Sequence, residues 1–143
     1  MKLFKESDWF ESTGTLIYDP HGRNVSTANK VSDPWWLLLM CDNEIIRYAD
    51  WWLKKQWVYT YGYSLYGSHI SVVKGEKPVN KAAWKKYHGK KIKFQYSNAI
   101  NDNGKHWWHF VKCDELGKIR TELGLPEKPP FFRYHITVGR KDP

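Results

Sequence analysis

Two short segments of the chain repeat one pattern, and this repeat constrains the fold more than any other feature. Residues 69–72 read HISV and residues 135–138 read HITV, so each segment contains a histidine, an isoleucine, a small hydroxyl residue and a valine. The β-branched side chains in both segments favour strands. Because one segment lies in each half of the chain, the sequence predicts a duplicated α+β architecture in which two sheet lobes face each other across a groove.

Strand alternation gives each segment two faces. Residues i and i+2 of a strand project to the same side, so His69 and Ser71 are expected together, as are His135 and Thr137. The isoleucines and valines then point the opposite way, into a core. We call the side that carries the histidines the histidine face, and we predict that it is polar and open to a ligand.

The same alternation adds further candidates to the histidine face. Gly67, Gly75 and Gly139 are expected there, where small residues would leave space for a ligand. Arg133 and Lys141 are expected on the same side as His135, where positive charge would attract phosphate. The two cations accompany only one of the two histidines, which predicts that the segments differ in how they hold a substrate.

The remaining elements are predicted from apolar periodicity, capping residues and turn residues. Residues 92–96 and 107–112 are expected to form a hairpin across the turn at 101–104. The other expected elements are strands at 15–18, 35–40, 67–73 and 134–140, a helix capped by Asp42 or Asn43 that extends to Trp57, a short helix at 81–87 capped by Asn80, and a helix at 114–123 ended by Gly124 and Pro126.

Length and composition restrict the class of protein. The 143 residues suit one domain over positions 1–143. A hydrophobic content of 41% with 27% charged residues excludes a disordered chain, and no apolar run is long enough for a transmembrane helix. Two cysteines, Cys41 and Cys113, are too few for a disulfide framework or a zinc site. A reduced, cytoplasmic protein without a metal is the expected class.

Charge and aromatic content indicate the kind of ligand. The net charge of +8 favours partners that carry phosphate. Aromatic residues make up 17% of the chain, with nine tryptophans, and most of these rings are expected in the core because they lie in apolar periodic segments. A few rings, with Tyr18 and Tyr66 as candidates, are predicted to stack on a nucleobase.

Two imidazoles on either side of a phosphodiester form an acid–base pair. An unperturbed histidine titrates near pH ~6.5, so one ring accepts a proton while the other donates one. The hydroxyls of Ser71 and Thr137 are placed to donate hydrogen bonds to non-bridging phosphate oxygens. When a ribose 2′-OH or a water serves as nucleophile, this chemistry requires neither a metal nor another cofactor.

This pair of segments resembles the signature of the two-histidine (2H) phosphoesterase superfamily, which includes the LigT-like proteins. The family pattern is H-x-[ST]-hydrophobic, once in each lobe of a pseudo-twofold fold, and His69, Ser71, His135 and Thr137 match it. The resemblance implies an α+β fold of antiparallel sheets that face a central groove, with helices outside. It also implies a metal-independent phosphodiesterase whose histidines exchange acid and base roles.

Within the superfamily, the compact length and the spacing are most similar to the phage anti-CBASS phosphodiesterases. That resemblance implies hydrolysis of 3′-5′ linkages in cyclic di- or trinucleotide immune signals, in the cytoplasm of an infected bacterium, with no obligate protein partner. This chain departs from the group by ending six residues after Thr137. Two alternatives stay open: an RNA end-processing enzyme for 2′,3′-cyclic ends or 2′-5′ linkages, and a protein that binds nucleotides or RNA without turnover.

The other histidines and the lysine-rich segment support no second site. His106 and His109 are expected on opposite faces of their strand, which makes them a poor metal pair. His21 and His88 are expected on the surface. The lysine run at 85–93 is interpreted as a solvated face that also steers polyanions.

Overall fold

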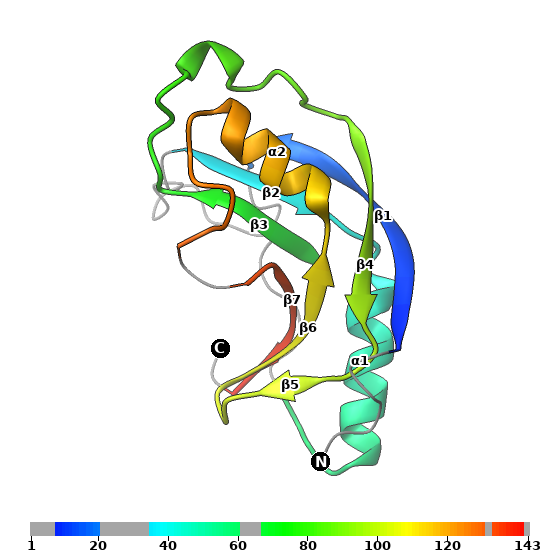
Figure 1. Cartoon of the computed structure of the whole chain (residues 1–143). Helices are drawn as coiled ribbons and strands as arrows, with labels where there is room; N and C mark the ends of the chain where they lie inside the picture. Colours follow the sequence, from blue (N-terminus) through cyan, green and yellow to red (C-terminus); the bar gives the residue numbers. More distant parts are fainter. Residues whose placement is uncertain (1–7, 21–34, 61–66, 131–132, 142–143) are drawn as a thin grey trace.

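The structure is a computed structural model that describes residues 8–20, 35–60, 67–130 and 133–141. Two helices are interspersed among seven strands in the described part of the chain, as Figure 1 shows. The elements are β1 (Trp9–Tyr18), β2 (Trp36–Met40), α1 (Glu44–Lys55), β3 (His69–Lys74), the 3-10 turn η1 (Lys81–Ala83), β4 (Lys91–Ser97), β5 (Asn101–Asp102), β6 (His106–Lys112), α2 (Asp114–Glu122) and β7 (His135–Arg140).

Antiparallel pairing joins the strands into one sheet in the order β3-β2-β1-β4-β6-β7, and β5 also pairs with β6. The two ends of this order, β3 and β7, lie alongside each other, with Cα atoms within 8 Å at several positions. The sheet is therefore strongly curved and nearly closes into a barrel (Figure 1). This arrangement confirms the predicted α+β class with antiparallel strands, although the strands form one continuous sheet.

The topology of the chain is duplicated. A β-β-α-β unit made of β1, β2, α1 and β3 is followed by a second made of β4, β6, α2 and β7. The strand order reads the same from both ends, and the central pair is β1 with β4. Each helix packs against the last strand of the other unit, α1 against β7 and α2 against β3. The two units are therefore interlocked rather than merely joined.

One buried cluster lies between the sheet and the helices. Ile70, Val72 and Ile136 are completely buried and Val138 is 1% exposed, which confirms the predicted core side of both repeated segments. Full burial of each such aliphatic side chain contributes about 1.5–3 kcal/mol. The cluster also contains Leu16, Leu37, Leu39 and Phe94 from the sheet, Ile46, Ala49 and Leu53 from α1, and Leu116, Ile119 and Leu123 from α2.

Both helices end with the same hydrogen-bond pattern. After α1, the amides of Trp57 and Val58 donate to carbonyl oxygens in its last turn, and Gly124 and Leu125 do so after α2. This is the Schellman motif, which requires a residue with positive φ after the helix. The predicted stop at Gly124 is confirmed by its φ of 78°, whereas Trp57 adopts a φ of 60° at the matching position of α1.

Three predicted elements differ from the structure. β1 begins at Trp9 rather than at residue 15, because its first half pairs with β4 while its side chains stay largely exposed. The predicted helix at 81–87 is one 3-10 turn over Lys81–Ala83. The Asn103-Gly104 turn joins β6 to β5, since β4 ends at Ser97 and the chain bends before it reaches the turn. The expected antiparallel pairing of 92–96 with 107–112 is confirmed at Gln95–Lys112 and Tyr96–Val111.

Neither helix of the described ranges is long and apolar enough to cross a bilayer. Cys41 and Cys113 are both free thiols, and burial raises the pKa of each above that of an exposed thiol.

Candidate active site

The two histidine strands occupy equivalent positions in the sheet. Each is paired with the strand that precedes its helix, β3 with β2 and β7 with β6, and the two ladders have the same register. The two registers agree from the first to the last residue of β3 and β7, so the similarity extends beyond the four residues of each repeated segment. Equivalent pairs are His69–Met40 and His135–Phe110, Ser71–Leu38 and Thr137–Trp108, Val73–Leu37 and Gly139–Trp107, and Lys74–Trp36 and Arg140–His106.

Both strands contain a β-bulge at the same residue of the repeat. Val72 in β3 and Val138 in β7 have no partner across the ladder, so two residues of the strand oppose one of its neighbour. A bulge of this kind shifts the alternation of faces by one residue. Val73 and Gly139 consequently join the valine before them on the core side, and both are buried.

The imidazoles are held by the same hydrogen bond. Nδ1 of His69 lies 2.9 Å from the carbonyl oxygen of Gly67, and Nδ1 of His135 lies 2.7 Å from that of Arg133. A carbonyl oxygen only accepts, so each Nδ1 carries a hydrogen and donates it. The neutral rings therefore both present an unprotonated Nε2. An unprotonated Nε2 can accept a proton, and the same atom can donate one once the ring is protonated.

The two rings affect each other electrostatically. Burial lowers the pKa of His69, and the positive charges of Lys74 and His135 lower it further, against the opposing effect of the Gly67 carbonyl. Burial also lowers the pKa of His135, with a smaller contribution from His106 and opposition from the Arg133 carbonyl. Two imidazoles with lowered pKa values favour a state in which at most one of them is charged near neutral pH.

The hydroxyls lie where alternation predicts them. Ser71 and Thr137 are half-buried, like the histidines two residues before them, while the isoleucine between each pair is fully buried. Aromatic rings accompany both segments. The ring of Trp36 lies 6.3 Å from that of His69, and Trp108, the partner of Thr137, lies 5.9 Å from Phe110.

The bulges bring two further cations to the histidine face. Lys74 is opposite Trp36 and its Nζ lies 5.1 Å from the centre of that ring; Arg140 takes the equivalent place opposite His106. Alternation counted without a bulge places neither cation there. The sequence does carry a signal, because both segments extend to H-I-[ST]-V-x-[KR].

The same shift corrects the expected positions of Lys141 and Gly139. Lys141 is exposed, follows the last residue of β7 and donates its amide hydrogen to the carbonyl of Lys105. A side chain added at Gly139 would lie 2.7 Å from Oγ1 of Thr60, so this position accommodates Thr60 rather than a ligand.

Gly67 also leaves no space for a ligand, whereas Gly75 has open space around it but lies outside the strand. A side chain at Gly67 would lie 2.6 Å from Oδ1 of Asn43, which accepts a hydrogen bond from the Ser68 amide. Gly75 has a φ of 76° and lies in the turn after β3, outside the strand. The glycines therefore serve close packing and turn geometry.

Of the proposed substrate contacts, Arg133 lies over an aromatic ring opposite one of the histidines. Its guanidinium carbon is 3.9 Å from the ring centre of Phe110, the partner of His135. Arg133 also lines a cavity of about 700 Å³ between β4, β6 and the segment after α2, together with Lys112 and Lys128. None of the four motif residues lines this cavity, so it adjoins the histidine face on the His135 side without including it.

The two tyrosine candidates lie elsewhere. Tyr18 is 4% exposed and belongs to the core cluster, where its ring packs edge-on against Trp84 at 5.0 Å. Stacking of Tyr18 on a base would require the core to open. Tyr66 lies outside the described residues.

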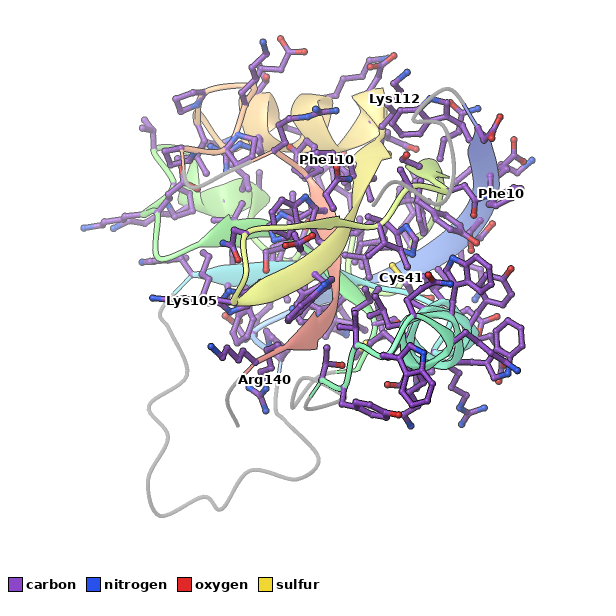
Figure 2. The ribbon with its side chains drawn as sticks, turned by 90° about the horizontal axis from the view of Figure 1, so that it is seen from below. Phe10, Cys41, Lys105, Phe110, Lys112 and Arg140 are labelled. Carbon is purple, nitrogen blue, oxygen red and sulfur yellow. The ribbon has the colours of Figure 1, made fainter. Side chains whose placement is uncertain are left out.

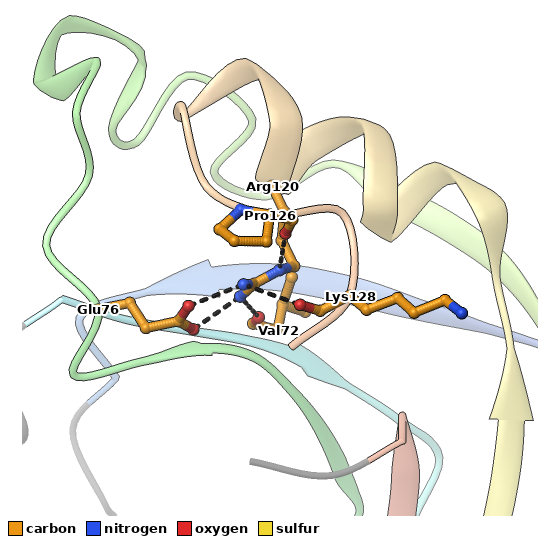
Figure 3. Close-up of polar contacts among 5 residues, drawn as sticks. All are labelled: Val72, Glu76, Arg120, Pro126 and Lys128. Atoms are coloured by element: carbon orange, nitrogen blue, oxygen red, sulfur yellow. Dashed lines mark hydrogen bonds and ion pairs between the residues drawn. The ribbon is translucent and has the colours of Figure 1, made fainter. Parts of the chain in front are cut away.

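A buried arginine supports the first segment from behind, as Figure 3 shows. Arg120 of α2 is 0% exposed, and its Nη1 and Nη2 each donate to one carboxylate oxygen of Glu76 at 2.7 Å. Nη1 also donates to the carbonyl of Val72, at the bulge, over 2.9 Å. Nε donates to the carbonyl of Pro126 and Nη2 to that of Lys128, so all five donors are used.

The remaining histidines that the structure describes lie as predicted. His109 is 4% exposed and its Nδ1 donates to the carbonyls of Ser97 and Ala99, whereas His106 is exposed on the opposite face. His88 is exposed as well, and His21 lies outside the described residues. The lysine run faces solvent with ion pairs to nearby acids: Lys85 with Asp19, Lys86 with Glu122 and Lys90 with Glu115.

Comparison of the chain with models of protein families, with curated proteins and with solved structures finds no match. Any assignment of function therefore depends on the residues and the geometry of the site.

Proposed function

We propose that this protein is a metal-independent phosphodiesterase of the 2H type, in which His69 and His135 act as general acid and general base. The observation that carries the proposal is the identical setting of the two histidines. They share register, bulge and the bond from Nδ1 to a carbonyl, on strands that lie alongside each other. Two independent structural histidines would have no reason to share all of these features.

Each step of the proposed reaction uses a group on the histidine face. A neutral imidazole removes the proton of a ribose 2′-OH, and the 2′ oxygen attacks the neighbouring phosphorus. The bond from phosphorus to the 5′ oxygen breaks, and the second, protonated imidazole transfers its proton to that oxygen. The products are a 2′,3′-cyclic phosphate and a free 5′-OH. The hydroxyls of Ser71 and Thr137 stabilise charge on the non-bridging oxygens.

For the substrate, we propose the cyclic di- or trinucleotide signals of bacterial antiviral defence, on the resemblance of the motifs to phage anti-CBASS phosphodiesterases. The net charge of +8 and the cations beside the histidines support a polyanionic substrate. A phage protein with this activity would act in the host cytoplasm during infection.

Chromatography of reaction products tests the proposal directly. The protein is incubated with a panel of cyclic dinucleotides, RNA with 2′,3′-cyclic ends and 2′-5′-linked RNA, with and without EDTA. We expect linear products from cyclic dinucleotides, no effect of EDTA, and a loss of about 10²–10⁴-fold for His69→Ala and for His135→Ala. His88→Asn, at an exposed histidine whose Nδ1 accepts a hydrogen bond from the Tyr18 amide, serves as the matched control, because the asparagine side chain retains an acceptor.

Two results would contradict the proposed chemistry. Strong inhibition by EDTA would indicate a metal-dependent reaction. Cleavage of a 2′-deoxy linkage at the rate of the ribose linkage would exclude the 2′-OH as nucleophile. Preference for RNA ends over cyclic dinucleotides would favour the end-processing alternative.

One observation favours a second candidate, binding of single-stranded nucleic acid without turnover. Tyr48, Trp51 and Trp57 expose large rings on and after α1, and Nζ of Lys55 lies 5.3 Å from the ring centre of Trp51. Exposed rings beside cations form stacking platforms for bases. Retention of an intact oligonucleotide by the protein, without product, would support this function instead.

A further inference from the structure

We propose that Lys74 and Arg140 bind phosphates that flank the scissile phosphate, one on each side, so that the substrate carries more than one phosphate. This inference rests on the proposed function and specifies its substrate class. The substrate is then an oligonucleotide, linear or cyclic, rather than a nucleoside 2′,3′-cyclic phosphate.

The first observation is that the two cations are equivalent. Each lies five residues after its histidine and two residues after the bulge, in the same register with the neighbouring strand. The bulge is what turns both side chains to the histidine face. The duplicated unit therefore contains a histidine, a hydroxyl and a cation, and the cation belongs to the site as much as the hydroxyl does.

The second observation is that the cations lie in opposite directions from the histidine pair. Every ladder from β3 to β7 is antiparallel, and the path contains five of them, so β3 and β7 run in opposite directions. Five residues of strand span about 16 Å. Lys74 and Arg140 therefore extend from their own histidines in opposite directions along the histidine face.

The third observation concerns the hydrogen bonds of Arg140. Its Nε is buried, and the described residues provide no hydrogen-bond partner for it. A buried donor of a charged group that has no partner among the described residues is a candidate contact for an anionic ligand. The guanidinium offers parallel donors that match two oxygens of one phosphate. Figure 2 shows Arg140 on the side of the molecule that also carries Lys105, which adds to the positive charge there.

Binding of uncleavable probes tests this proposal. Tryptophan fluorescence measures the affinity for deoxyadenosine oligonucleotides with one phosphate and with three, over a range of salt concentrations. We expect Arg140→Ala to weaken binding of the three-phosphate probe about tenfold and to reduce the slope of log Kd against log salt by about 0.7, the value for one phosphate contact with a single strand. The one-phosphate probe should lose much less affinity.

Three controls make the result decisive. Arg47→Ala removes an exposed arginine of α1 that is paired with Glu44 and should change neither quantity. Arg140→Lys should restore part of the slope. Lys74→Ala, at an exposed position, should reduce the slope equally, and it provides the test if Arg140→Ala does not fold.

The outcomes separate this proposal from the proposed function. Equal losses for both probes, or unchanged slopes in Arg140→Ala and Lys74→Ala, would overturn the role of the two cations even in an active enzyme. A reduced slope in a protein that cleaves none of the ribose substrates would support the phosphate contacts and contradict the enzyme.

Discussion

Removal of the Glu76 carboxylate should be among the most destabilising single substitutions outside the aliphatic core. Glu76→Ala would leave the guanidinium of Arg120, which is 0% exposed, without the two bonds of 2.7 Å that balance its charge. The remaining partners of Arg120 are three neutral carbonyl oxygens, on Val72, Pro126 and Lys128. A buried positive charge would then lack a counter-charge.

Two independent estimates of the cost agree. Unit charges about 4 Å apart interact by about 4 kcal/mol at the effective dielectric constant of a protein. Loss of one partner of a buried ion pair costs about 3–5 kcal/mol in measured cases. Glu76→Ala should therefore lower the free energy of unfolding by about 3–5 kcal/mol, a large part of the roughly 5–15 kcal/mol that a domain possesses.

Urea unfolding followed by tryptophan fluorescence measures this change. The matched control is Glu44→Ala, which removes an exposed ion pair with Arg47 and should cost less than about 0.5 kcal/mol. The double variant Glu76→Leu/Arg120→Met removes both charges and leaves only the carbonyls unpaired, so it should be more stable than Glu76→Ala. A cost below about 1 kcal/mol for Glu76→Ala would refute the reasoning, because the guanidinium would then have to be solvated.

Three further outcomes are expected. Trp57→Gly should stabilise the protein by about 1 kcal/mol in urea unfolding, because the ring is 82% exposed and φ is 60°, whereas Trp51→Gly within α1 should destabilise it by a similar amount. If the proposed reaction takes place, the profile of kcat/KM against pH should be a bell with both limbs below pH ~6.5, since His69 and His135 both have lowered pKa values; limbs above pH ~7 would contradict this. Burial lowers the pKa of His109, so the unfolded state binds a proton at a pH where the folded state does not. The free energy of unfolding should therefore fall as the pH drops below ~6.5, and it should fall less steeply in His109→Gln.

Periodicity and turn chemistry were sufficient to predict most of the secondary structure. The alternation in the repeated segments depends on local sequence, so the burial of Ile70 and Ile136 and the partial exposure of the histidines followed directly. Gly124 marked the end of α2 because a positive φ favours glycine. The first half of β1 was not predicted, because partners on β4 determine that pairing and the β1 segment itself gives little signal.

The bulges explain what the sequence could not show about the site. Bulges at Val72 and Val138 depend on how each strand meets its neighbour, and nothing in the local sequence marks an unpaired valine. Alternation without them placed Gly139 on the histidine face and omitted Arg140. Comparison of the two segments over six residues, instead of four, would have indicated the shared cation, although not the face on which it lies.

The two units have equivalent residues at the positions that the proposed reaction uses, and different residues around those positions. Histidine, hydroxyl, bulge and cation are equivalent, which suits a phosphate that is approached from two sides. At the position two residues before the histidine, however, one unit has Gly67 packed against Asn43, while the other has Arg133 over the ring of Phe110 and beside a cavity. A symmetric acid–base pair cannot by itself choose a direction for the substrate. The residues that differ can, so the His135 side is where we expect this protein to set the orientation of a bound nucleotide.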